Sequence, residues 1–179
     1  MVCGKPSMKN LVIVEGETEE KFFRDFKDRL KVPAMIVKYN LAQEDLNSKI
    51  TGKKYHVVSV VLDSDIFNEK TISKINKNLK SINADIINIY IQNKNFEDEL
   101  VRATENCNTL RDLCNLFGCR SKSSSEFKSR FLKVSNLSLK KDFKVDFHML
   151  YSYNDMGDVK FNKGIVRIGK TIFTKKKSK

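Results

Sequence analysis

Acidic residues stand directly after two short, largely apolar runs of the chain. Glu15 follows the run at 11–14, and Asp63 and Asp65 follow the run at 57–62. Runs of this length are typical of buried strands, and in an open parallel sheet the functional crevice lies beyond the carboxyl ends of the strands. We therefore expect the three carboxylates to gather at one edge of a sheet.

Clustered carboxylates repel one another unless a cation holds them, and ligand sets made only of oxygen suit Mg2+ or Mn2+. Glu19 lies four residues after Glu15, on the first turn of an expected helix, so it would face the same cation from the other side. The pattern predicts a hard divalent metal site. Each residue also has a plainer interpretation: Glu19 would complement the helix dipole, and an aspartate after a strand is often a turn or cap residue.

The elements that must position these acids alternate between strand and helix, which predicts an α/β fold with a central, mostly parallel sheet flanked by helices. A first helix is expected after Gly16, with Thr18 as its N-cap. Its buried side would carry the apolar residues Phe22, Phe26 and Leu30. The other expected strands and helices are strands at 35–37 and 85–91, one short helix within 40–54, and a helix at 72–82.

A four-three rhythm of apolar residues predicts one long amphipathic helix at 97–117, ending at Gly118. Cys107 and Cys114 would share its buried face as reduced thiols. Beyond it we expect a helix carrying Phe127 and Phe131, and a hairpin around 162–164.

Two segments resemble the Toprim domain: Glu-Gly-Glu-Thr-Glu at 15–19 and Asp-Ser-Asp at 63–65. Toprim domains occur in topoisomerases, bacterial primases, ribosomal-RNA maturases, OLD-family nucleases and RloB-like defence proteins. The Glu-Gly-x-Thr-Glu form is most similar to the last two groups. The resemblance implies a Rossmann-like Toprim catalytic domain at 9–117, followed at 118–179 by a basic C-terminal subdomain with a lysine-rich tail.

By this resemblance Glu15, Asp63 and Asp65 are the catalytic residues. Glu15 matches a glutamate assigned to acid/base work or metal binding, and the two aspartates match metal ligands. Glu19 matches a second glutamate that helps to bind a second metal. Glu97 lies in a segment similar to one after the fourth strand of RloB-like proteins, which makes it a further candidate ligand, although it would also serve as a cap of the long helix.

The basic charge of the chain lies almost entirely in its last third. Residues 1–117 hold 18 basic and 17 acidic side chains, whereas residues 118–179 hold 16 basic and 5 acidic ones, a net charge of +11. Such a segment attracts polyanions, with nucleic acid, DNA or RNA, as the usual partner. The nominated contacts are Lys122, Lys128 and Lys133, on or near the helix that follows the serine-rich segment; a solvated basic face is the plainer interpretation.

Several classes of protein are disfavoured by the sequence. No apolar run approaches the length of about 20 residues that spans a bilayer, and the first residues lack a signal core, so a cytoplasmic protein without membrane contact is expected. The four cysteines form no Cys-x-x-Cys pair, which disfavours a zinc site and hence a primase. The absence of a Gly-x-x-x-x-Gly-Lys-[Ser/Thr] motif means that an OLD-type ATPase would have to be a separate partner chain.

These expectations favour a Toprim nuclease, an enzyme that hydrolyses phosphodiester bonds of nucleic acid with Mg2+ or Mn2+. A role in phage defence rests on family analogy alone. One alternative is a non-catalytic nucleic-acid-binding protein on a Toprim scaffold. Another is a receiver-like phosphoacceptor domain, which would want two adjacent acids after the first strand, a pair that Glu15 and Gly16 do not supply.

Overall fold

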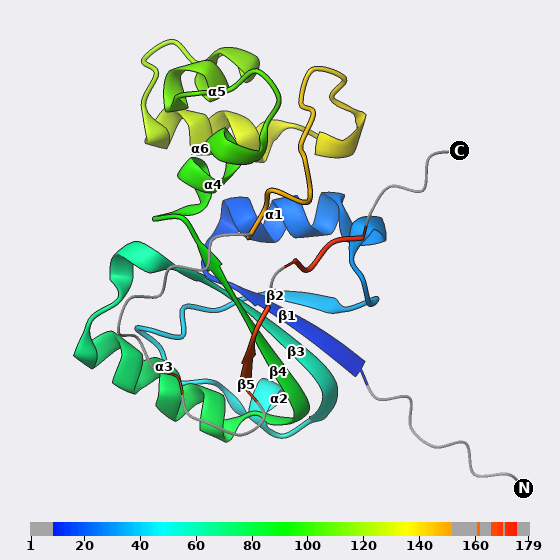
Figure 1. The fold of residues 1–179 in the computed structure, drawn as a ribbon, viewed down its shortest axis with the longest axis vertical. Coiled ribbons are helices and arrows are strands. Elements are labelled where there is room, and N and C mark those ends of the chain that lie inside the picture. Colours follow the sequence, from blue (N-terminus) through cyan, green and yellow to red (C-terminus); the bar gives the residue numbers. More distant parts are fainter. Residues whose placement is uncertain (1–8, 152–160, 162–165, 170, 175–179) are drawn as a thin grey trace, which may run out of the picture.

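Backbone hydrogen bonds join five strands of the described residues into one sheet, in the order β2-β1-β3-β4-β5, with every neighbouring pair parallel. The computed structural model describes residues 9–151, 161, 166–169 and 171–174 (Figure 1). The strands are β1 (Lys9–Val14), β2 (Met35–Lys38), β3 (Lys54–Asp63), β4 (Asn83–Gln92) and β5 (Val166–Ile168). The helices are α1 (Glu17–Asp25), α2 (Ser48–Thr51), α3 (Glu69–Ser81), α4 (Phe96–Ala103), α5 (Leu110–Leu116) and α6 (Ser124–Lys133).

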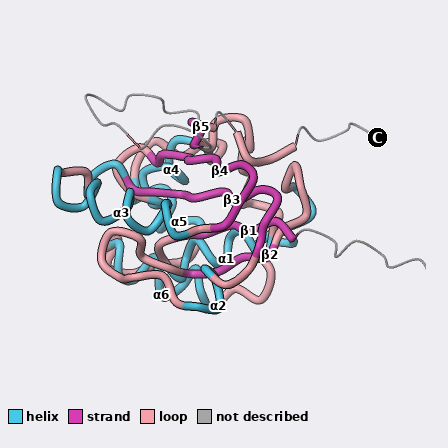
Figure 2. The backbone as a smooth tube through the Cα atoms, turned by 90° about the horizontal axis from the view of Figure 1, so that it is seen from below, coloured by secondary structure: helices cyan, strands magenta, loops and turns pink. Residues whose placement is uncertain are grey.

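Both faces of the sheet are buried, which explains why the central strands are apolar without alternation. In β1, Leu11 and Ile13 pack into one hydrophobic cluster, which also holds Ile75 of α3. Val12 on the same strand points the other way, into a second cluster with residues of α1 and α4–α6. Figure 1 shows the sheet between α3 and the group formed by α1 and α4–α6, and Figure 2 shows the strands following one another from β5 to β2. The predicted α/β class with a parallel sheet and flanking helices is confirmed.

The strands predicted at 11–14, 35–37, 57–62 and 85–91 all lie within β1 to β4. The expected short helix is α2, and the helix with Phe127 and Phe131 is α6. Within the described residues, no helix is both long and apolar enough to cross a membrane.

The predicted single helix at 97–117 is wrong. The chain forms α4 and α5, with a loop between them in which Asn106 takes a left-handed conformation with φ 60°. Thr109 caps the second helix, since its side chain accepts a hydrogen bond from the backbone N–H of Asp112. The apolar rhythm continues across the break because both helices bury one side in the same cluster. Cys107 therefore lies in the loop, and does not share a helix face with Cys114.

Two details of α1 also differ from the prediction. Its N-cap is Gly16 rather than Thr18, which lies inside the first turn and is buried. The helix ends at Asp25, so Leu30 is not on it; Leu30 follows a short 3-10 turn and bridges to Phe173 near the end of the described chain.

The described part of 118–174 packs on the α/β unit. Phe131 of α6 lies against Phe96 of α4, with ring centroids 6.1 Å apart, and Phe173 lies against Phe22 of α1 at 6.0 Å. Strand β5 extends the sheet beside β4. The turn of the hairpin expected at 162–164 falls outside the described residues.

Candidate functional site

The acidic residues lie where the sheet changes its direction of winding. From β1 the chain crosses to β2 on one side, and from β3 it crosses to β4 on the other, so the connections leave β1 and β3 in opposite directions. Such a switch point leaves a crevice beyond the carboxyl ends of the two strands. Glu15 follows β1 and Asp63 ends β3, so the fold brings them to this crevice.

The carboxylate of Glu15 is fixed through one of its two oxygens. Asn40, which follows β2, donates from its Nδ2 to Oε1 of Glu15 at 2.8 Å. The other oxygen, Oε2, is buried and has no hydrogen-bond partner in the described part of the chain. Burial raises the pKa of Glu15, and the negative charge of Asp65 adds to the rise, whereas the nearby backbone of Asp63 and the side chain of Asn40 lower it.

Asp63 has the most perturbed pKa of the strand-end acids. Burial is the largest cause, and the charges of Glu19, Glu15, Asp65 and Glu97 follow, together raising the pKa to about 9. Its Oδ1 is buried and has no hydrogen-bond partner among the described residues. Five carboxyl groups thus act on one another at this edge, and Asp63 is the member that all the others influence.

Glu19 is fully enclosed and uses both oxygens. The backbone N–H of Gly16 donates to Oε2 at 2.5 Å, and Nε2 of Gln92 donates to Oε1 at 3.0 Å. Burial, followed by the charges of Glu15 and Glu97, raises its pKa to about 8 despite these bonds. Glu19 therefore joins the cluster and also ties the start of α1 to the end of β4, which is more than a favourable interaction with the helix dipole.

The loops after β3 and β4 are tied to each other beside the cluster. Asp65 lies in a short 3-10 turn, and its backbone N–H donates to the carbonyl oxygen of Lys94 at 3.3 Å. The N–H of Lys94 donates in return to Oγ of Ser64 at 2.9 Å. Asp65 is exposed, so it lies at the open side of the cluster.

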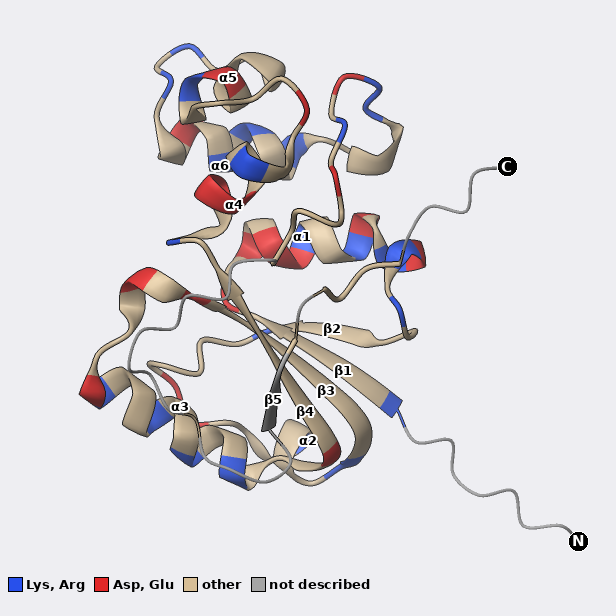
Figure 3. Ribbon diagram, viewed as in Figure 1, with Lys and Arg blue, Asp and Glu red and all other residues tan. Residues whose placement is uncertain are grey.

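Glu97 does not cap α4, because Asn95 does: its side chain accepts from the backbone N–H of Asp98. Glu97 is buried, and its Oε1 lies 3.2 Å from Nζ of Lys128 on α6. Figure 3 shows acidic segments at the starts of α1 and α4, with basic segments of α6 close to α4. Lys128 is therefore the predicted lysine that the fold brings to the acids.

The other two nominated lysines lie elsewhere. Lys122 donates from Nζ to the carbonyl oxygen of Cys119 at 2.8 Å and to the side chain of Asn115, so it closes the end of α5. Lys133 is the exposed last residue of α6. Neither contacts any of the five acids in the described structure.

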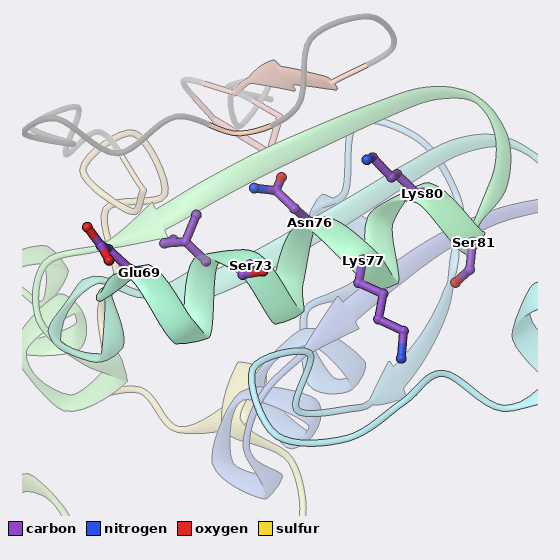
Figure 4. Close-up of a pocket in the computed structure, with 7 residues that line it drawn as sticks. Glu69, Ser73, Asn76, Lys77, Lys80 and Ser81 are labelled. Atoms are coloured by element: carbon purple, nitrogen blue, oxygen red, sulfur yellow. The ribbon is translucent and has the colours of Figure 1, made fainter.

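A cleft of about 520 Å³ opens beside Glu15. Its walls come from the ends of β1 and β2 and from α6. The lining residues include Glu15, Gly16, Lys38, Tyr39, Asn40 and Lys128. A larger hollow of about 780 Å³ lies along α3 and includes Lys77 and Lys80 (Figure 4). All of its lining residues belong to that one helix, so it is separate from the strand ends.

The acids suit a hard cation chemically. Among the described residues, no group of three or more His, Cys, Asp or Glu side chains is arranged so that it could hold a metal ion as it stands. However, Glu15 and Asp63 stand at the ends of neighbouring strands, and each has one buried oxygen without a hydrogen-bond partner in the described structure. Carboxylate oxygens are the ligands that Mg2+ and Mn2+ prefer. Binding would require side-chain rotation that brings carboxylate oxygens of several of these acids to one ion.

Three residues around the acids are not among those predicted. Asn40 and Gln92 are polar residues just beyond or at the end of strands, a signal that was available in the sequence. Tyr151 is buried, and burial and then the charges of Glu19 and Glu99 raise its pKa well above the usual value. It comes from a distant segment, and nothing in its sequence neighbourhood indicates this position.

Comparison of the chain with protein-family models, curated proteins and solved structures finds no match.

Proposed function

We propose that this protein is a Toprim-like nuclease that hydrolyses phosphodiester bonds of nucleic acid with Mg2+ or Mn2+. The observation that carries the proposal is the gathering of Glu15, Glu19, Asp63, Asp65 and Glu97 at the switch point of the sheet. A purely structural role does not account for the cluster, since burying like charges together costs stability. Titratable groups perturbed in this way are characteristic of functional sites.

Glu15, Asp63 and Asp65 would hold the ion, with Glu97 and Glu19 behind them. When bound, Mg2+ or Mn2+ supplies polarisation of a phosphoryl oxygen and neutralisation of developing charge. Glu15 would hold the ion through Oε2, which has no hydrogen-bond partner in the described structure, while Asn40 fixes its Oε1. Glu19 is positioned by Gly16 and Gln92, so it would orient the shared site rather than move.

Lys128 is the lysine that we assign to the substrate phosphate. It lines the cleft with Glu15, and its present partner is the carboxylate of Glu97. Half of its side chain is exposed, so the ammonium is able to exchange Glu97 for a phosphate oxygen without crossing the core. The basic residues of 118–179 would add affinity for the polyanion that does not depend on sequence. An ATPase, if this site requires one, would be a separate chain.

A receiver-like phosphoacceptor is the rival that one observation favours, because the strand order β2-β1-β3-β4-β5 is shared by flavodoxin-like folds that include receivers. In that function Asp63, at the end of β3, would accept a phosphoryl group. The side chains support it less well, since the position after Glu15 is glycine. Acetyl phosphate should then modify wild type and not Asp63→Asn.

The test is cleavage of plasmid DNA, linear DNA, single-stranded DNA and structured RNA, each with Mg2+ or Mn2+. Wild type, Glu15→Gln and Asp63→Asn are compared, with Glu105→Gln as a control, because Glu105 is an exposed acid paired with Lys144 after α4. Cutting by wild type and the control, abolished in both site variants, is expected. Binding without any cutting would favour the scaffold alternative.

A further inference from the structure

Lys94 occupies a backbone conformation that its residue type disfavours. It lies between β4 and α4 with φ 60°, in the left-handed region that glycine and asparagine adopt most readily. Both of its backbone groups are fixed by the loop after β3: its N–H by Oγ of Ser64, and its carbonyl oxygen by the N–H of Asp65. The conformation is therefore imposed by the two loops that carry the acidic cluster.

Glycine at this position would satisfy the same two backbone bonds without a steric cost. Strained residues of this kind concentrate at functional sites. The side chain of Lys94 is exposed, and within the described ranges its ammonium forms no ion pair. Among the described residues, the lysine side chain is thus not used to hold the fold.

The position of Lys94 complements that of Lys128. Lys128 approaches the acids from α6, on the side where β1 and β2 end. Lys94 lies on the side where β3 and β4 end, hydrogen-bonded to the residue two positions after Asp63. A polyanion that approaches five carboxyl groups needs cations at the rim to offset repulsion, and these two lysines come from different elements, α6 and the loop between β4 and α4.

We propose that Lys94 is a second phosphate-binding residue of this site, which contacts the phosphodiester backbone of the nucleic acid next to the bond that is cut. This inference rests on the proposed function. It adds a contact with the nucleic acid at the edge of the sheet where β3 and β4 end. The rigid attachment of its backbone to the Asp65 loop would fix the distance between the bound backbone and the acids. The contact is to phosphate, so it would not distinguish one base from another.

The test measures binding of fluorescein-labelled single-stranded and duplex oligonucleotides of DNA and RNA, in EDTA so that no cleavage occurs. Lys94→Gly and Lys94→Asn remove the ammonium and suit the left-handed backbone, and Lys94→Arg keeps a cation. Lys80→Gln is the control, since Lys80 is an exposed lysine in the last turn of α3, next to the start of β4 and so away from the strand ends that carry the acids.

We expect binding to weaken about tenfold in Lys94→Gly and Lys94→Asn. The slope of log affinity against log salt concentration should fall by about 1. Lys94→Arg should restore both, Lys80→Gln should change neither, and the unfolding temperature of Lys94→Gly should equal or exceed that of wild type. Unchanged binding in Lys94→Gly, or no binding by wild type, would overturn the inference. Because binding is measured without catalysis, an inactive wild type that still loses affinity in Lys94→Gly would refute the nuclease alone.

Discussion

Nζ of Lys128 on α6 lies 3.2 Å from Oε1 of Glu97 on α4. The two residues are 31 positions apart in the sequence, and their contact places a cation of the basic last third next to the acids of the strand ends. The pair is asymmetric, because the Glu97 side chain is 8% exposed and that of Lys128 is 51% exposed. Lys128 is therefore the more exposed partner, and in the proposed function it is the one that would meet the phosphate.

Replacing Lys128 by methionine is expected to lower the cleavage rate by about 10²-fold, the usual cost of losing one group that stabilises developing charge. Lys128→Arg should recover part of the rate. The unfolding temperature should change little, because half-exposed ion pairs contribute at most about 1 kcal/mol. Single-turnover kinetics measure the effect, with Lys133→Met on the same helix as a control. Equal losses in both variants would mean that only the overall charge of α6 matters.

Asp63→Asn is expected to stabilise the fold while it abolishes activity. The pKa of Asp63 is raised to about 9, so the folded chain keeps a proton that the unfolded chain releases near pH 4. The stability supplied by that proton is complete below about pH 4 and is lost as the pH rises towards 9. The gain in unfolding temperature, measured with a chelator present, should therefore be larger at pH 9 than at pH 5. A gain that does not depend on pH would contradict the assignment.

Glu126→Gln is expected to destabilise the protein at neutral pH. Hydrogen bonds from the backbone N–H of Arg120 and from Ser121 lower the pKa of Glu126 to about 2. Because the folded pKa is depressed, this contribution is complete above about pH 4.5 and is lost as the pH falls towards 2. Urea unfolding at pH 7 and at pH 2.5 should show the difference from wild type shrinking at the lower pH. A constant difference would assign the effect to packing.

Glu99→Leu tests the attachment to α4 of the segment that ends at Tyr151. Glu99 is fully buried and accepts hydrogen bonds from Arg102, from the backbone of Tyr151 and from the backbone of Asn93. Removing one partner of a buried ion pair costs about 3–5 kcal/mol. Chemical denaturation should show this loss, whereas Glu105→Gln at an exposed pair should cost less than about 1 kcal/mol. An equal loss of unfolding free energy in Glu99→Leu and Glu105→Gln would show that the hydrogen bonds of Glu99 add no stability.

The strand ends could be predicted because their signal is local: a buried strand in a parallel sheet must be apolar throughout, and Glu15 and Asp63 are the first charged residues after such runs. The break between α4 and α5 could not be predicted from periodicity. Two short helices that bury the same side in one core keep the apolar spacing of one long helix. The break itself is marked only by the N-cap Thr109 and by the left-handed backbone of Asn106.

The lysines assigned to the proposed site could not be predicted individually. Lys122, Lys128 and Lys133 have similar surroundings in the sequence, and only the packing of α6 on the rest of the fold selects Lys128. No local sequence pattern indicates the position of Lys94, because this position depends on hydrogen bonds to a loop 30 residues away. Tyr151 is another long-range case, because it reaches the acids from a segment 88 residues beyond Asp63.

The most direct test of the central claim is the single-turnover cleavage rate of the best substrate, titrated with Mg2+, for wild type, Asp63→Asn and Glu105→Gln. The proposed site predicts a rate for wild type and Glu105→Gln that rises with Mg2+ to saturation and vanishes on chelation, with no detectable cleavage by Asp63→Asn at any concentration. Cleavage by Asp63→Asn at the wild-type rate would contradict a catalytic role for the acids at the strand ends.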